Sequence, residues 1–482
     1  MAKVRQDAGR RNPKKLVFSP PAATNLFAAA VGMQVIKTLY PHKLVLSCDG
    51  PLCIFALQML RMFKKMKKLI LFLFATMVLS LSTYAQSRLT VGGYGEVALT
   101  RNFYSDNVYR YSSASAHAGE SHGRFDIPHA VIYLGYDFGK GWTMQSEIEF
   151  EHTGTGVATE REFEEAGEWE KEVEKGGEVE LEQFWIQKAF LPQLNVRMGH
   201  IVVPVGGLNN AHEPLNFFTV YRPEGESTIL PSTWHDTGIS IWGQAGAWRY
   251  EAQFLAGLDA LMFTRDNWIK NGPKSAFEYK VANQYGAALR IDNTSVRNLR
   301  LSLSGYAGNS MRNTYPNDAL SERYDVKGTV LVGAFDFAYT GKRLVVRGNA
   351  DYGSLSDAAV ISRYKAGKAA GDSPYSSTPV GGAAYAAGIE AGYDILPWLQ
   401  PRDKEQKLFV FGRYEAYDSY VPSEGQADFS YTAKQRIAFG LNWSPVPQIA
   451  VKAEWSHRFL SSQYNNEPSV SIGVAYMGFF KR

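Results

Sequence analysis

Residues 142 to 151 read Trp-Thr-Met-Gln-Ser-Glu-Ile-Glu-Phe-Glu. Every second residue from Trp142 to Phe150 is apolar, apart from Ser146, and the intervening residues are all polar. An alternation with a period of two places the two sets on opposite faces of a β-strand. Directly before it, residues 139–141 (Gly-Lys-Gly) are typical of a tight hairpin turn, and residues 129–138 read as the partner strand. The pattern predicts a β-hairpin with one apolar and one polar face.

The same alternation recurs along the chain in segments of about ten residues, the length of a tilted transmembrane strand. We identify sixteen such segments, with 14 to 18 as the range of the count. They span residues 89–101, 124–138, 142–152, 179–190, 195–203, 237–243, 248–257, 284–292, 299–308, 326–339, 343–353, 383–393, 407–418, 433–443, 449–458 and 469–480.

The connections between these segments alternate strictly between short and long. Outer-membrane barrels have this asymmetry, with short periplasmic turns and long extracellular loops. Trp142, Trp242, Trp248 and Trp443 lie at segment ends beside short turns, where a periplasmic aromatic girdle is expected. The sequence therefore predicts an all-β fold, a transmembrane antiparallel β-barrel of about 16 strands in the outer membrane of a Gram-negative bacterium.

The N-terminal region reads as an export signal preceded by a segment of a different kind. A basic stretch at 66–68, an apolar run at 69–81 and small residues at 83–85 predict a signal peptide over residues 62–85. Translation could start at Met62 or at Met66. Residues 1–61 read as a non-native upstream extension, and residues 86–482 as the barrel.

Bulk composition changes once this leader is set aside. Residues 1–85 carry 13 Lys or Arg and 2 Asp, so the formal net charge of the remaining chain is −7, although the whole chain is +4. The basic pI of the whole chain is therefore no argument for a nucleic-acid partner. Cys48 and Cys53 also lie in the leader, so the predicted mature chain needs no disulfides.

Charged side chains recur on the polar phase of many segments. Bare charges in a dry core are costly, and sixteen strands leave an aqueous channel, so we expect a water-filled interior. The candidate pore-lining or solute-binding residues are Arg197, Arg222, Arg249, Arg290, Arg300, Arg343, Arg347, Arg413, Lys434, Arg436, Lys452, Glu147 and Glu149.

Two long loops differ from the rest in composition. Residues 159–182 contain eleven Glu and are interpreted as a solvated charged loop or short helix rather than a cation site. Residues 204–236 combine prolines, aromatics and mixed charges, too apolar for a free external loop, and predict inward folding or packing against a neighbouring subunit. The candidate constriction residues there are His212, Glu213, Glu224, Trp234, His235 and Asp236.

Residues 182–243 resemble the phosphate-selective porin O and P family, mainly through Glu-Gln at 182–183, Asn-Val-Arg-Met-Gly-His at 195–200 and Pro-Ser-Thr-Trp-His-Asp-Thr-Gly at 231–238. The resemblance implies a 16-stranded, trimeric outer-membrane barrel with an inward-folded third loop. It also implies an anion preference carried by Arg and Lys in the pore. Within that loop Arg222 is the obvious basic candidate, beside Glu224, Glu226 and Asp236.

These observations favour a porin for passive diffusion of small hydrophilic solutes, with a weak preference for anions such as phosphate. A non-conducting structural or adhesive barrel is the alternative. An enzyme is disfavoured because no nucleophile motif or metal-ligand spacing is present, and a TonB-dependent transporter because no plug domain precedes residue 89. The expected partners are outer-membrane lipid and lipopolysaccharide, the barrel assembly machinery, solutes or anions and two further copies in a homotrimer. No catalytic residue, metal, cofactor or nucleic acid is expected.

Overall fold

The computed structural model describes residues 88–152, 157–163, 169–175, 179–275, 279–313, 326–368, 378–400 and 405–481. The predicted signal peptide at 62–85 and the segment 1–61 lie outside these residues. Within the described part of the chain, every helix is too short or too polar to cross a bilayer.

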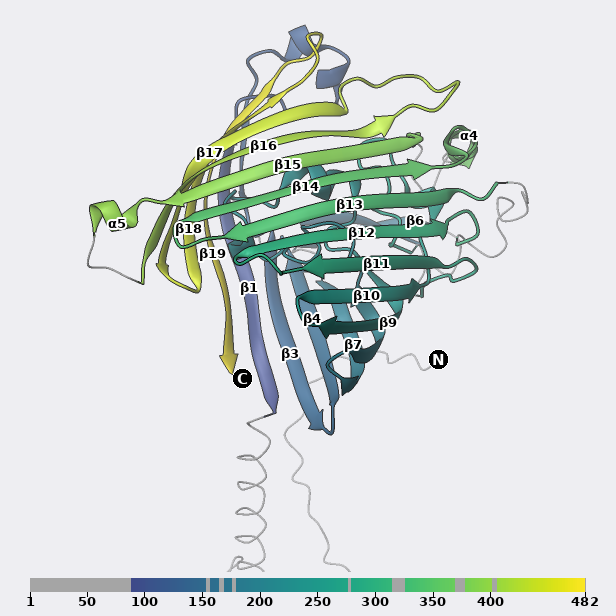
Figure 1. The fold of residues 1–482 in the computed structure, drawn as a ribbon. Helices are drawn as coiled ribbons and strands as arrows, with labels where there is room; N and C mark the ends of the chain where they lie inside the picture. The colour runs from purple at the N-terminus through teal and green to yellow at the C-terminus, as the bar shows by residue number, and fades with distance from the viewer. Residues whose placement is uncertain are drawn as a thin grey trace, which may run out of the picture. The chain divides into compact units, whose positions relative to one another are not determined.

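The strands form a closed antiparallel β-barrel (Figure 1). The first strand, β1 (Leu89–Asn102), pairs along one edge with the last strand, β19 (Glu467–Lys481). Along its other edge β1 pairs with β3 (His129–Gly139) and, further along, with the short strand β2 (His122–Asp126). Pro128 lies between β2 and β3, and proline cannot donate to a strand ladder. These two strands therefore occupy one position in the wall, and the seventeen strands of the sheet form sixteen wall positions, as predicted.

Each remaining wall strand pairs antiparallel with the next. Their bounds are β4 (Trp142–Glu151), β7 (Val179–Leu191), β8 (Leu194–Val202), β9 (His235–Ala245), β10 (Trp248–Leu255), β11 (Gly286–Asn293), β12 (Leu299–Asn309), β13 (Thr329–Thr340), β14 (Leu344–Leu355), β15 (Ala383–Asp394), β16 (Lys407–Val421), β17 (Ala433–Val446) and β18 (Ile449–Phe459).

The predicted hairpin between β3 and β4 is confirmed. Its turn residues Gly139, Lys140 and Gly141 have φ angles of 85°, 54° and 77°. Glycine adopts this left-handed region without steric cost, which explains the two glycines around the turn. The β3–β4 turn and the C-terminus lie at the lower end in Figure 1, and the long β1–β2 connection lies at the upper end.

The outer face of the wall is apolar. Leu289 on β11 and Leu303 on β12 point outward and are 61% and 64% exposed. Such a surface suits lipid, and a closed barrel that carries it lies in the outer membrane of a Gram-negative cell. Trp142 and Trp248 are exposed at strand ends, as the girdle prediction requires.

Trp242 was predicted to join this girdle, and that prediction is wrong. Its indole Nε1 donates to Gln187 at 2.9 Å, and the guanidinium groups of Arg197 and Arg249 lie over its ring. Ile239 and Ile241 occupy the outward phase of β9, so Trp242 shares the inward phase with Ser240. Strand alternation, rather than nearness to a turn, decides its direction.

The Glu-rich loop is neither helical nor irregular over its described residues. β5 (Val157–Phe163) and β6 (Trp169–Lys175) pair as a separate two-stranded sheet. The expectation of a loop or short helix is therefore corrected to a hairpin.

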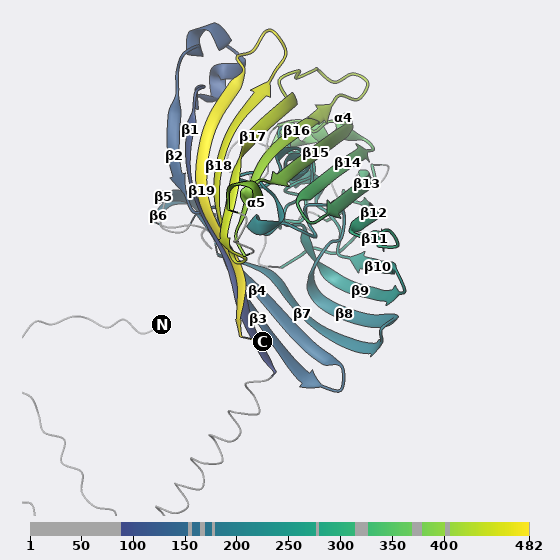
Figure 2. The same cartoon turned by 60° about the vertical axis from the view of Figure 1, so that its left-hand side comes forward.

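Part of the barrel interior is filled by protein. Residues 204–236, which we call the inward segment, include the short helix α3 (Glu224–Ile229), and Figure 2 shows blue-green chain within the curve of the wall. The inward segment, residues around 258–269 and helix α4 (Ala358–Lys368) contribute to one apolar cluster with the inner faces of strands such as β13 and β15. The expectation of a wholly water-filled interior is wrong on this side of the barrel, because apolar side chains replace the water there.

Candidate functional site

Inward-facing charges of the wall bind the backbone of the inward segment. Lys452 on β18 is 1% exposed, and its ammonium donates to the carbonyl oxygens of Pro214 (2.5 Å), Phe217 (3.1 Å) and Thr219 (2.8 Å). A buried irregular backbone leaves carbonyl and N–H groups that secondary structure does not satisfy. Lys452 was predicted to line a pore, and instead it satisfies three of these carbonyls.

Wall carboxylates do the same for backbone N–H groups. The amide of Val220 donates to Glu454 at 2.8 Å, and the amide of Gly225 donates to Glu415 at 3.0 Å. On the opposite part of the wall, the Arg290 guanidinium donates to the Gly206 carbonyl at 2.9 Å. The inward segment is therefore anchored through charge-assisted hydrogen bonds, the stronger class of such bonds.

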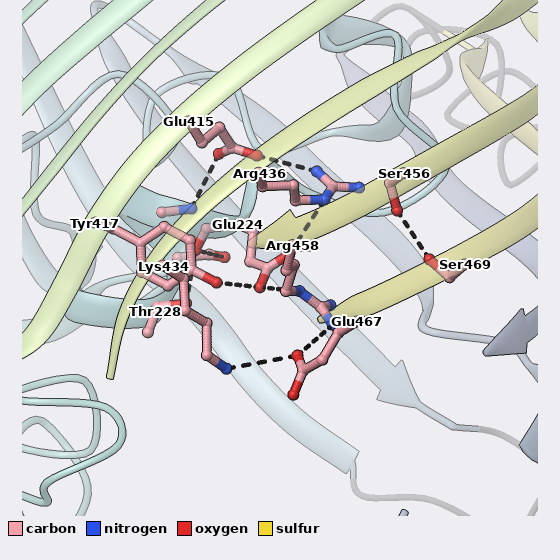
Figure 3. Close-up of polar contacts among 12 residues, drawn as sticks. Glu224, Thr228, Glu415, Tyr417, Lys434, Arg436, Ser456, Arg458, Glu467 and Ser469 are labelled. Carbon is pink, nitrogen blue, oxygen red and sulfur yellow. Dashed lines mark hydrogen bonds and ion pairs between the residues drawn. The ribbon is translucent and has the colours of Figure 1, made fainter. Parts of the chain in front are cut away.

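Glu224 in α3 forms the densest of these anchors (Figure 3). Its carboxylate lies 2.5 Å from Nε of Arg458 and 3.3 Å from Nε of Arg436, and it accepts a hydrogen bond from the Tyr417 hydroxyl. Burial raises the pKa of Glu224, but the two guanidinium groups outweigh burial and hold that pKa at about 2. Glu224 is therefore ionised throughout the physiological pH range.

The two arginines around Glu224 are themselves shared with other wall carboxylates. Arg436 pairs with Glu415 at 3.0 Å and with Glu454, and Arg458 pairs with Glu467 at 3.1 Å. Lys434, another predicted pore residue, lies 3.7 Å from Glu467, and Arg413 lies 3.0 Å from Glu415. These sequence-predicted residues are brought together as a network of alternating charges.

A second network lies on β10 to β15. Arg249, Arg290 and Arg300 converge on Asp292, at 3.3, 2.8 and 3.5 Å. Arg347 pairs with Glu390 at 2.9 Å, and Glu390 also lies 3.9 Å from Arg413 of the first network. Each of these basic side chains is paired with a carboxylate, so their predicted role as pore-lining residues stays a prediction.

Arg197 and Arg343, like Lys452 and Arg222, lie outside both networks. Arg197 on β8 donates to Gln187 at 3.3 Å and stacks over Trp185. Arg343 lies in the short turn before β14 and is corrected from a wall residue to a turn residue.

Arg222 is held against the β1–β4 side of the barrel. Its side chain donates to the carbonyls of His212 (3.3 Å) and Ser232 (3.2 Å) and to the hydroxyl of Tyr94 (3.2 Å), and it lies 3.9 Å from Glu149. Burial lowers the pKa of Arg222, but Tyr94 and the nearby carboxylates outweigh burial and raise the pKa above its ordinary value. Arg222 therefore stays charged while it fixes the fold of the inward segment.

The candidate constriction residues have different surroundings. Trp234 is fully buried in the apolar cluster, 5.0 Å from the ring of Tyr306, so it is corrected from a solute contact to a core residue. His212 is also buried. The carboxylate of Glu213 accepts a hydrogen bond from the side-chain amide of Asn216, in the same segment, at 2.8 Å.

His235 and Asp236 end the segment at the start of β9. Nδ1 of His235 lies 2.5 Å from Nε2 of His200. The carboxylate of Asp236 is buried, and it lies 3.7 Å from the ammonium group of Lys280. His235 lines the cavity described next, and Asp236 is not among its lining residues.

A polar cavity of about 1050 Å³ lies inside the barrel between the inward segment and the wall. Its lining includes seven carboxylates, six Lys or Arg and five histidines, so opposite charges are close to balance at neutral pH. The carboxylates are those of Glu96, Glu149, Glu151, Glu180, Glu182, Glu224 and Glu454. The basic residues are Arg124, Arg222, Lys270, Lys274, Arg436 and Arg458, and the histidines are His122, His129, His152, His200 and His235.

Our reading of the sequence missed Glu182 as a lining residue. The β4–β7 register shifts between Glu147 and Ile148, which pair with Gln183 and Leu181, so Glu182 is the extra residue of a β-bulge. The bulge buries both Glu182 and Gln183 on the inner side. The available signal is the pair of adjacent polar residues between Leu181 and Phe184, which breaks the alternation.

Comparisons with known proteins give a distant set of relatives. No protein-family profile matches the chain. An uncharacterized protein of Aquifex aeolicus is 27% identical over 382 residues, which cover 78% of this chain and 77% of that protein.

Solved structures with a similar chain path are outer-membrane proteins. They include the outer membrane channel DcaP of Acinetobacter baumannii (12% identity, 81% and 97% of the two chains covered, TM-score 0.48). They also include Salmonella typhi OmpF (9%, 82% and 99%, TM-score 0.48) and an anion-selective porin from Comamonas acidovorans (9%, 81% and 99%, TM-score 0.45). The fold assigned to this chain rests on its own strand pairing.

Proposed function

We propose that this chain is an outer-membrane porin that lets small hydrophilic solutes diffuse through its barrel. The observation that carries the proposal is the cavity of about 1050 Å³, lined by charges and hydroxyl groups, inside a closed barrel with an apolar exterior. A lining of this kind favours water and ions over apolar solutes. The inward segment forms one side of the cavity, and we assign to it the role of narrowing the pore.

We further propose a weak preference for anions. The six Lys or Arg of the cavity lining are the groups that would attract anions, and the seven carboxylates beside them keep the preference weak. Near balance argues against strong selectivity, so membership in the phosphate-selective porin O and P family stays a proposal. The proposed partners are outer-membrane lipid and lipopolysaccharide, the barrel assembly machinery and two further copies in a trimer.

A non-conducting barrel is the second candidate, and one observation favours it. The apolar cluster fills the interior beside β13 to β15, and many charge-assisted bonds fix the inward segment. A barrel blocked in this way would serve a structural or adhesive role.

The two candidates differ in a planar bilayer. A porin opens discrete conductance steps. In a KCl gradient, a reversal potential shifted toward the equilibrium potential of chloride supports the anion preference. A reversal potential shifted toward the equilibrium potential of potassium would refute the anion preference and leave the porin proposal standing. Silence at high protein load would favour the non-conducting barrel.

A further inference from the structure

Three side chains with metal-binding atoms meet where the inward segment touches the wall. Glu147 of β4, Glu182 of β7 and His212 of the inward segment are 0%, 1% and 5% exposed. One carboxylate oxygen or ring nitrogen of each lies within 4.8 Å of the others. The β-bulge at Glu182 directs this carboxylate inward, and bulges often re-aim a side chain beside a functional site.

The atoms that face one another in this cluster lack hydrogen-bond partners. Oε1 of Glu147, Oε2 of Glu182 and Nε2 of His212 are all buried and make no hydrogen bond among the described residues. A buried acceptor without a partner costs free energy, and a buried carboxylate without a counter-charge costs more. Arg222, a guanidinium that interacts with Glu182, is already engaged with the carbonyls of His212 and Ser232, with Tyr94 and with Glu149. Within the cluster, positive charge can come only from a second proton on His212, whose Nε2 lies 3.7 Å from Oε1 of Glu147.

Hydrogen bonds behind the cluster orient its ligands. Nδ1 of His212 lies 3.1 Å from the carbonyl oxygen of Asn209, which can only accept, so Nδ1 carries a proton and Nε2 points toward Glu147. The indole of Trp185 donates to Gln183 at 3.1 Å, and the amide of Gln183 donates to the other carboxylate oxygen of Glu147. Metal-binding histidines and carboxylates are commonly oriented by such outer partners.

We propose that Glu147, Glu182 and His212 bind one divalent transition-metal ion of the Zn²⁺ class, which links the inward segment to the barrel wall. One imidazole nitrogen and two carboxylate oxygens suit Zn²⁺ or Mn²⁺ better than Ca²⁺, which takes six to eight oxygens. Two ligand atoms of a tetrahedral Zn²⁺ ion lie about 3.4 Å apart. Nε2 of His212 and Oε1 of Glu147 are 3.7 Å apart. Glu182 also lines the polar cavity, which gives the ion a route of entry.

This inference rests on the fold and does not require conduction. A proton shared among the carboxylates would satisfy part of the same cluster without a metal. The Glu149 carboxylate lies beside Glu182, so such sharing is the competing explanation. A second proton on His212 would pair its Nε2 with Oε1 of Glu147, which lies 3.7 Å away. The metal ion differs from both protons because one group then contacts all three atoms at once.

The test is Zn²⁺ binding by the full mature chain, folded in detergent and stripped with a chelator. Calorimetry should give one ion per chain, and Glu182→Gln or His212→Gln should weaken affinity at least tenfold, since even outer partners of metal ligands contribute 10–100-fold. His117→Gln is the matched control, because it removes a partly buried histidine that lies 3.1 Å from Glu120 in the connection between β1 and β2, outside the cluster. It should leave the affinity unchanged.

A second measurement needs no variant. X-ray absorption of the Zn²⁺-loaded protein should show a first shell of nitrogen and oxygen with one imidazole, and urea should unfold the loaded protein at a higher midpoint than the stripped protein. Absence of stoichiometric binding would overturn the proposal and support the shared proton. Loss of binding in His117→Gln, with Glu182→Gln and His212→Gln unaffected, would overturn it as well. A heat-induced mobility shift on a detergent gel confirms that each variant is folded.

Discussion

Replacing Glu224 by Gln tests whether ion pairs anchor the inward segment. The substitution keeps the shape of the side chain but removes the charge that Arg436 and Arg458 share. The pKa of Glu224, about 2 in the folded protein against 4.5 for a free carboxyl, corresponds to roughly 3 kcal/mol. Breaking a buried pair typically costs about 3–5 kcal/mol. Because both arginines keep other carboxylates, we expect a loss at or just below the lower limit of this range, about 2 to 3 kcal/mol.

A loss of this size changes the equilibrium constant between the wall-attached and detached states of the inward segment by about 30- to 150-fold. Glu224→Gln should lower the urea midpoint of the detergent-folded barrel and add flickering or larger conductance steps in planar bilayers. Glu213→Gln is the matched control, since Glu213 lies on the same segment and contacts Asn216 of its own segment. Its midpoint and step size should equal those of the wild type. An unchanged midpoint and unchanged steps in Glu224→Gln would refute the anchoring role.

The same pair gives a pH dependence with a definite sign. A carboxylate whose folded pKa is lowered stabilises the fold above its unfolded pKa, and this stabilisation is lost as the pH falls toward the folded pKa. The wild type should therefore be more stable than Glu224→Gln above about pH 4.5. The difference should shrink between about pH 4.5 and pH 2. A difference that stays constant over this range would show that the charge of Glu224 is not its source.

Three further predictions concern the barrel, its core and its selectivity. The mature protein should migrate faster on a detergent gel before boiling than after it; identical mobility would argue against a closed barrel. Trp234→Ala should lower the free energy of unfolding by about 3–5 kcal/mol through the cavity it leaves, whereas Trp234→Phe should cost far less because the indole N–H has no partner among the described residues. A loss in Trp234→Ala within about 0.5 kcal/mol, the usual range for surface substitutions, would place Trp234 outside the core. Lowering the pH should move the reversal potential toward anions as the cavity carboxylates and histidines bind protons, and a shift toward cations would contradict this origin of selectivity.

The strands of the barrel wall were predictable from the sequence because the patterns that define them lie within short stretches of the chain. Alternation and turn residues depend on neighbours in the chain, so the β3–β4 hairpin and the sixteen wall positions followed from short windows of sequence. The prediction for Trp242 was wrong because it relied on nearness to a turn rather than on which alternate residues of β9 face inward. Glu182 was missed where a bulge changed the phase within β7.

The interior was predictable only in part. The sequence placed Lys452 and Arg436 on the inner face correctly, but it did not reveal their partners, which lie more than 200 residues away in the inward segment. A charged residue on an inner face can contact water or a buried backbone, and the pattern of the strand is the same in both cases. Composition indicated that residues 204–236 are unusually apolar, and the packing of Trp234 agrees with that.

Single-channel recording in a planar bilayer tests the central claim most directly. The claim is that the polar cavity beside the inward segment belongs to a pore that conducts ions. Protein shown to be folded by its gel shift should open uniform conductance steps, larger or flickering in Glu224→Gln and unchanged in Glu213→Gln. No steps at high load from the same folded sample would contradict the claim and identify a non-conducting barrel.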